Sequence, residues 1–137
     1  MSEPKHVGKI LLTEDNPGDV LLLKETFVEA DLYGSYYVAT DGDEALDFLH
    51  QRGDYADAPR PDIVFLDWYL PKKSGKEVLT ELTTDETLEQ IPVVVMTGTQ
   101  PVLDDLKSER PRADAYVLKP LQPDELIGIV DEFSSEQ

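Results

Sequence analysis

Short apolar runs alternate along the whole chain with segments whose apolar residues recur at helical spacing. Apolar runs that end in turn residues are typical of buried strands, whereas a spacing of about three to four residues is typical of a helix that packs on one face. The runs predict strands at 9–13, 36–40, 62–67, 92–97 and 115–118. The helical spacing predicts helices at 20–30, 44–51, 76–83 and 123–133.

The alternation of these elements predicts an α/β fold. Strands that alternate with helices build a parallel sheet covered on both faces. Residues 63–66 are all apolar, which fits a strand buried on both sides. The length of 137 residues is close to that of a single domain. We therefore expect a doubly wound sheet in one domain over residues 1–137, with residues 1–7 loosely held.

The composition excludes several kinds of protein. The chain contains no Cys, which excludes a disulfide framework and a thiolate metal site. Its two histidines, His6 and His50, are too few and too far apart for a His-rich metal centre. No apolar run approaches the roughly 18–20 residues of a membrane span, and the start lacks the apolar stretch of a signal peptide. We therefore expect a cytoplasmic protein that does not enter a membrane.

Negative charge is the most unusual property of the chain. It has 29 acidic residues against 12 Lys and Arg, and a net charge of -17. This excess argues against direct binding to nucleic acid, which needs a basic surface. Self-repulsion at this charge disfavours the compact state, and about 1 M salt screens it. An ordinary acidic domain is one interpretation. We favour the other, a protein from a halophile whose fold depends on salt.

Polar side chains follow four of the predicted strands at the points where the strands end. In doubly wound sheets, ligands bind outside the carboxyl ends of the strands. The residues at these ends are Glu14, Asp15, Asp67, Thr97 and Lys119. Three clustered carboxylates repel one another strongly unless a cation joins them. Mg²⁺ suits such a site because it prefers oxygen ligands and leaves room for water and phosphate.

These side chains are suited to phosphoryl transfer, which needs positioning, a metal ion and donors to the phosphoryl oxygens. Asp67 can act as a carboxylate nucleophile and form an aspartyl phosphate. Thr97 and Lys119 would then hold the phosphoryl oxygens. Each residue alone also fits an ordinary role as a solvated loop residue, a helix cap or a strand-end hydroxyl. The hypothesis therefore depends on their joint placement at four strand ends.

The chain resembles the receiver domains of response regulators in two-component signalling, and among them the stand-alone receivers associated with phytochromes. The resemblance covers nearly the whole chain. The matching segments are 10–27, 41–49, 52–79, 91–99 and 115–120. It implies a flavodoxin-like five-stranded sheet in the order 2-1-3-4-5, with about five helices.

The resemblance also implies a role for each residue at the strand ends. Asp67 matches the residue that a sensor histidine kinase phosphorylates. Glu14 and Asp15 match the acidic pair that binds Mg²⁺ together with Asp67 and the backbone carbonyl of Tyr69. The protein would not be a conventional enzyme, because it would catalyse phosphoryl transfer and dephosphorylation only at its own Asp67.

Further positions match the parts of the family that respond to phosphorylation. Thr97 matches the switch hydroxyl, and Tyr116 matches the aromatic residue that turns inward on phosphorylation. Lys119 matches the phosphate-binding lysine, and the Lys119–Pro120 bond is expected to be cis.

Two features depart from the family pattern. Pro111 and Arg112 stand where the family usually has a helix end and a glycine, so we expect the helix within 100–114 to be short or frayed. Tyr69 is bulky for its position and is expected to hinder the water that removes the phosphoryl group. We expect no output domain after Gln137. The signal would leave through a surface around 103–133, to a downstream protein or a second copy of the chain, or pass on as a phosphoryl group in a phosphorelay.

Other functions remain open on the sequence. A receiver-like scaffold would keep the fold without being phosphorylated. A phosphohydrolase of the haloacid-dehalogenase class would need an acid two residues after Asp67, where Tyr69 stands, so turnover would lack its proton donor. A flavodoxin-like cofactor carrier would need a first loop that binds phosphate, which Glu14 and Asp15 would repel.

Overall fold

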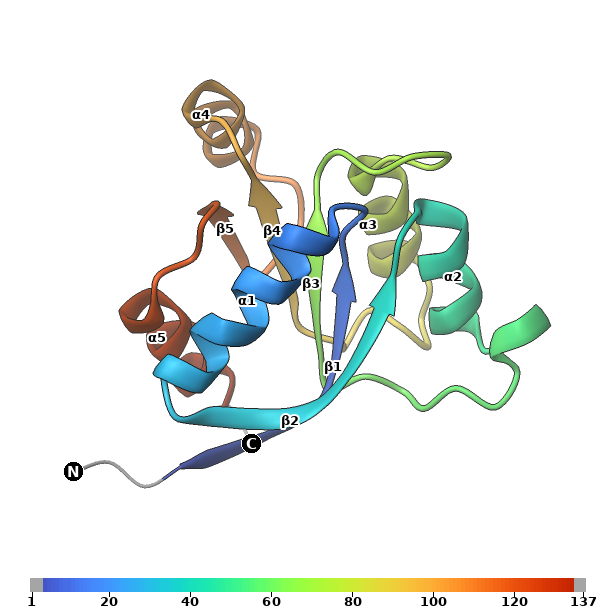
Figure 1. Cartoon of the computed structure of the whole chain (residues 1–137). Coiled ribbons are helices and arrows are strands. Elements are labelled where there is room, and N and C mark those ends of the chain that lie inside the picture. Colours follow the sequence, from blue (N-terminus) through green and yellow to red (C-terminus); the bar gives the residue numbers. More distant parts are fainter. Residues whose placement is uncertain (1–3, 135–137) are drawn as a thin grey trace.

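A parallel sheet runs through the middle of the molecule, with helices on both of its faces (Figure 1). The computed structural model of the chain describes residues 4–134. The strand order β2-β1-β3-β4-β5 confirms the predicted topology and the flavodoxin-like fold. The strands are β1 (Lys5–Thr13), β2 (Leu32–Ala39), β3 (Ile63–Asp67), β4 (Val93–Thr97) and β5 (Ala115–Leu118).

Two apolar layers hold the helices on the sheet. Alternate residues of a strand point to opposite faces, so β3 contributes Val64 and Leu66 to one layer and Ile63 and Phe65 to the other. The first layer packs against α2 (Gly42–His50), α3 (Gly75–Thr84) and α4 (Gln100–Glu109). The second packs against α1 (Pro17–Glu29) and α5 (Pro123–Ser134). A short 3₁₀ helix, η1 (Gly53–Tyr55), follows α2. No helix within residues 4–134 is long and apolar enough to cross a membrane.

Side-chain caps fix the starts of α1 and α2 near the carboxyl ends of the strands. Asn16 accepts hydrogen bonds from the backbone N–H groups of Gly18 and Asp19, and Pro17 occupies the first turn of α1. Asp41 caps α2 by accepting from the N–H of Glu44 at 2.7 Å. Such caps satisfy N–H groups that the helix itself leaves without partners.

The first two strands are longer than predicted. They were expected at 9–13 and 36–40, but their pairing begins at Lys5 with Leu32 and continues through His6 with Tyr33. The expectation of a loosely held segment is therefore wrong for residues 5–7, and residues 1–3 lie outside the described part of the chain. Polar residues and glycines interrupt the apolar pattern in the paired arm, residues 5–8 of β1 and 32–34 of β2. Backbone pairing does not require apolar side chains, so the pattern could not predict it.

Helix α4 is not shortened by the proline that follows it. It has ten residues, as many as α3, so the expectation of a short helix is wrong. Pro101 lies in the first turn, where a missing N–H costs nothing. Arg110 ends the helix in the left-handed region, with a φ of 51°, and its N–H donates to the carbonyl of Leu106. Pro111 thus follows the helix and does not interrupt it.

Candidate functional site

Residues from three strand ends converge at the carboxyl edge of the sheet. The hydrogen bonding of the sheet continues one residue past β1, where the N–H of Glu14 donates to the carbonyl of Ala39 at 3.0 Å. It continues in the same way past β5, where the N–H of Lys119 donates to the carbonyl of Thr97 at 2.8 Å. The backbone therefore fixes Glu14, Asp67 and Lys119 relative to one another.

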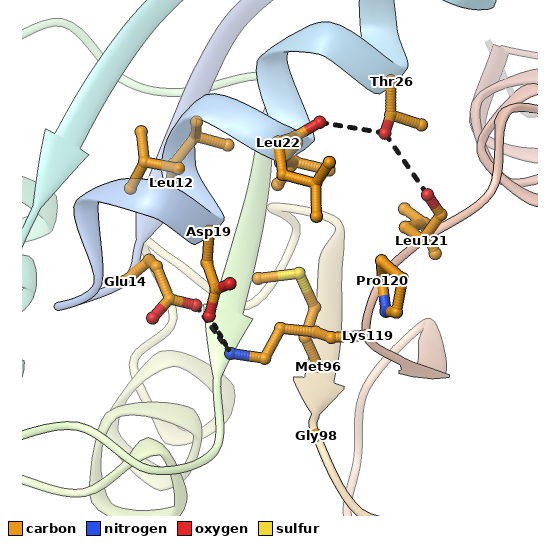
Figure 2. Close-up of a pocket in the computed structure, with 12 residues that line it drawn as sticks. Leu12, Glu14, Asp19, Leu22, Thr26, Met96, Gly98, Lys119, Pro120 and Leu121 are labelled. Atoms are coloured by element: carbon orange, nitrogen blue, oxygen red, sulfur yellow. Dashed lines mark hydrogen bonds and ion pairs between the residues drawn. The ribbon is translucent and has the colours of Figure 1, made fainter.

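The amine of Lys119 is the centre of the cluster. Its Nζ lies 3.0 Å from Asp67 Oδ2, 2.9 Å from Glu14 Oε2 and 3.1 Å from Asp19 Oδ2. Figure 2 shows the amine beside the carboxylates of Asp19 and Glu14. An ammonium group has three donors, and these three contacts use all of them. The arrangement fixes the direction in which Lys119 points.

Asp19 is a site residue that the sequence analysis missed. It lies in the first turn of α1 and reaches Lys119 from the helix, whereas the other carboxylates come from strand ends. Its place in the first turn of α1, directly after the strand end that carries Glu14 and Asp15, was a usable signal because that turn begins beside the cluster.

Glu14, Asp15 and Asp67 can together hold a metal ion. Each offers a carboxylate oxygen, and these oxygens lie within 4.8 Å of one another. Glu14 and Asp67 are buried, whereas Asp15 is exposed. An all-oxygen set of this kind fits Mg²⁺ or another hard divalent cation and does not fit a soft metal. The N–H of Tyr69 donates to Asp67 Oδ1 at 3.0 Å, which places the Tyr69 backbone beside the same carboxylate.

Burial and crowding shift the pKa values of the cluster. Burial raises the pKa of Glu14 to about 7, hydrogen bonding with Asp67 adds to the rise, and Lys119 opposes it. Burial alone would lower the pKa of Lys119. Its hydrogen bonds with Glu14 and Asp67 outweigh this effect, so its pKa lies above the ordinary value. Near pH 7 the cluster therefore holds a charged lysine and a Glu14 that is partly protonated.

Thr97 and Tyr116 lie on two neighbouring strands, Thr97 at the end of β4 and Tyr116 within β5. Thr97 is fully buried at the end of β4. Tyr116 pairs with Val95 in the ladder and is partly buried, and burial raises its pKa. Tyr116 borders a surface hollow of about 520 Å³, whose other lining residues are Lys107, Arg110, Pro111, Arg112 and Ala113. The Lys119–Pro120 bond is cis, as expected.

A second hollow, of about 290 Å³, lies beside the cluster between α1 and the segment after β5 (Figure 2). Glu14, Asp19 and Lys119 form its polar side, and its other lining residues are mostly apolar. The hydroxyl of Thr26 lies within hydrogen-bond distance of the carbonyls of Leu22 and Leu121. This contact ties α1 to the segment that carries Lys119.

Comparison with known proteins identifies the class. The family model of the response regulator receiver domain matches residues 10–131. The chain is 35% identical over 136 residues to response regulator Rcp1 of Synechocystis sp. This match covers 98% of the present chain and 92% of Rcp1. The chain therefore belongs to the response regulator receiver domain family and acts in two-component signal transduction.

Solved structures agree with this assignment. The fold is similar to the bacteriophytochrome response regulator AtBRR, with a TM-score of 0.83 and 35% identity over 92% of this chain and 91% of that one. It is also similar to the phosphorylated cyanobacterial phytochrome response regulator RcpA, with a TM-score of 0.74 and 38% identity over 93% and 91% of the two chains. The Mn²⁺-bound form of Rcp1 has a TM-score of 0.73 and 35% identity over the same shares. The predicted likeness to phytochrome-associated receivers is thus confirmed.

Proposed function

We propose that Asp67 accepts a phosphoryl group from the phosphohistidine of a sensor histidine kinase. The observation that carries this proposal is the Lys119 amine, held between Asp67 and Glu14 at 3.0 and 2.9 Å. A cation in that place partly neutralises a nucleophile that would otherwise repel an anionic phosphoryl group. The structure of RcpA, a relative, is that of a phosphorylated protein.

The two oxygens of Asp67 have different partners. Oδ1 accepts the N–H of Tyr69, and Oδ2 contacts Lys119. In the proposed reaction a carboxylate oxygen forms a bond to phosphorus while the bond from phosphorus to the donor nitrogen breaks, and its electron pair stays on the imidazole. Lys119 and the hydroxyl of Thr97 then contact the phosphoryl oxygens. Tyr69, which is 61% exposed, would slow the approach of the water that hydrolyses the aspartyl phosphate and releases inorganic phosphate.

Mg²⁺ is the proposed metal ion, with Glu14, Asp15, Asp67 and the backbone carbonyl of Tyr69 as its ligands. The ion would supply positive charge that offsets the carboxylates and the phosphoryl oxygens. Support comes from the three carboxylate oxygens within 4.8 Å of one another. Rcp1, which is 35% identical, has been solved with Mn²⁺ bound.

Phosphorylation would act through Thr97 and Tyr116 on the surface around 103–133. A pre-existing active conformation would become more populated when Thr97 binds the phosphoryl group and Tyr116 turns inward. The recipient would be a downstream protein or a second copy of the chain, in the cytoplasm and without direct contact to nucleic acid. The domain would modify only its own Asp67 and would not turn over a separate substrate.

Intact mass after incubation with Mg²⁺ and acetyl phosphate tests the proposal, with Asp67→Asn as the matched control. We expect one added phosphoryl group on the native protein and none on the variant. A folded native protein that gains nothing would favour the scaffold interpretation. A phosphoryl group retained by Asp67→Asn would place the acceptor elsewhere. Transfer onward to a histidine-containing protein would identify a phosphorelay intermediate.

A further inference from the structure

The segment between the proposed phosphoacceptor and α3 reverses the charge of the rest of the chain. Residues 68–76 contain Lys72, Lys73 and Lys76 and no acidic residue. The whole chain has only 12 Lys and Arg against 29 acidic residues. These lysines lie in the loop after Asp67 and in the first turn of α3, where Glu77 follows Lys76.

The backbone holds this segment in one shape at the edge of the site. The N–H of Gly75 donates to the carbonyl of Trp68 at 3.0 Å, and the N–H of Gly42 donates to the carbonyl of Pro71 at 3.1 Å. Gly75 packs so closely on the backbone of Asp67 and Trp68 that a Cβ would not fit. Lys72 adopts a φ of 66°, a left-handed conformation that is uncommon for a residue with a side chain. The backbone that carries the lysines is therefore tied to the position of Asp67, and Lys76 also borders a surface hollow with Glu77 and Glu81.

Two of the three lysines have charges that the protein does not pair. Lys72 lies 3.4 Å from Asp41 Oδ2. Lys73 and Lys76 are exposed, and among residues 4–134 neither side chain has an ion-pair or hydrogen-bond partner. Their charges are free to act on an approaching ion.

The site itself repels an anion. Glu14, Asp19 and Asp67 contact the amine of Lys119, and Asp15 offers a further carboxylate beside Glu14 and Asp67. A phosphodonor brings further negative charge to this edge. A local cationic surface raises the encounter rate of an anion in such a setting, and salt weakens the effect.

We propose that Lys73 and Lys76 guide small dianionic phosphodonors, of the acyl phosphate class, to Asp67. The inference rests on the proposed function of Asp67. A carboxylate oxygen of Asp67 forms the bond to phosphorus, the bond from phosphorus to the acyl oxygen breaks, and the carboxylate of the donor leaves with the electron pair. In this proposal Lys73 and Lys76 contact no reacting atom, and they raise the rate at which the phosphodonor reaches the site.

The test compares rates of phosphorylation by acetyl phosphate in Mg²⁺, followed by intact mass. The test variant is Lys73→Gln/Lys76→Gln, which leaves the Lys72–Asp41 pair in place. The matched control is Lys9→Gln/Lys107→Gln, which removes two exposed lysines from β1 and α4 and gives the same net charge. Circular dichroism at each salt concentration selects the conditions in which all proteins are folded.

At the lowest such ionic strength we expect the test variant to be phosphorylated about three- to tenfold more slowly than the native protein. The control should change by less than about twofold, and the differences should vanish near 1 M salt, where the screening length is about 3 Å. Lys73→Arg/Lys76→Arg should restore the rate, because it keeps the charge. Phosphoramidate, which carries less negative charge, should show a smaller effect.

Three results would overturn the inference. The test and control variants could slow equally, the defect could persist in 1 M salt, or the arginine variant could fail to restore the rate. A native protein that is folded but never phosphorylated would instead overturn the proposed function. The two failures are thus distinguished by the native protein in the same assay.

Discussion

Two kinds of ion pair occur in this molecule, and they differ in burial. The Lys119 cluster joins a lysine side chain that is 20% exposed to carboxylates of Glu14 and Asp67 that are 4% and 6% exposed. The Lys5–Asp131 pair joins side chains that are 37% and 61% exposed, at an almost equal distance of 3.1 Å. At similar distances the interactions of Lys119 with Glu14 and Asp67 should therefore be stronger, because water screens the Lys5–Asp131 pair more completely.

The largest expected difference is in stability after loss of the lysine. Lys119→Gln leaves Glu14 and Asp67 buried beside each other without a cation, so we expect the metal-free protein to lose about 2–3 kcal/mol of unfolding free energy at pH 8. Urea denaturation followed by circular dichroism measures this loss. A loss of unfolding free energy below about 0.5 kcal/mol would show that water screens the Lys119 cluster as well as it screens the Lys5–Asp131 pair.

Salt should separate the exposed charges from the buried ones. With a net charge of -17, the native protein should gain about 1–2 kcal/mol of stability between dilute buffer and 1 M salt, because repulsion between exposed carboxylates is screened. The loss of unfolding free energy caused by Lys119→Gln should change less between dilute buffer and 1 M salt. Melting curves in both salts measure the two effects. A melting temperature that does not respond to salt would contradict the expected adaptation to high salt.

The pH dependence should report the burial of Glu14. Its pKa is raised from 4.5 to about 7, so the proton stabilises the metal-free fold below pH 4.5 and this contribution is lost as the pH rises through 7. A metal ion must displace the same proton. We therefore expect the apparent affinity for Mg²⁺ to fall about tenfold from pH 8 to pH 6, or about 1.4 kcal/mol.

Fluorescence of Trp68, the single tryptophan and the neighbour of Asp67, provides the measurement. Glu14→Gln is the control, since it cannot titrate and should bind Mg²⁺ more weakly with a flatter pH profile. An affinity that is constant between pH 6 and 8 in the native protein would argue against a shared proton.

The smallest effect is expected at the exposed pair. Lys5→Gln should cost less than about 0.5 kcal/mol, because exposed pairs gain little in water. The same urea experiment measures it beside Lys119→Gln, with an identical chemical change. A loss as large as that of Lys119→Gln would mean that the β1–β2 arm depends on this contact.

The sequence was most informative for site residues that follow a strand, because the direction of parallel strands determines where those residues lie. Glu14, Asp67 and Lys119 could be predicted to meet, because carboxyl ends of parallel strands share one edge of a sheet. Asp19 was missed because it reaches the site from a helix, and its carboxylate reads equally well as a helix-start residue.

Elsewhere the local pattern was a weaker guide. The paired arm that begins at Lys5 and Leu32 could not be read from apolar periodicity, because its stability comes from backbone pairing. Helix α4 was expected to be short because of Pro111, but Arg110 ends the helix just before that proline. Both errors concern the boundary of an element, where β1 and β2 begin and where α4 ends, and boundaries are the part of an element that a local pattern defines least well.

The separation of the site residues along the chain has a consequence for synthesis. Glu14 and Lys119 are 105 residues apart, and β1 must pair with β2 and β3 in the middle of the sheet. A nascent chain that has emerged only as far as β4 carries all the carboxylates of the cluster but not the lysine that joins them. The ribosome therefore delivers the acidic residues first and their cation late, so the cluster is complete only after β5 has docked.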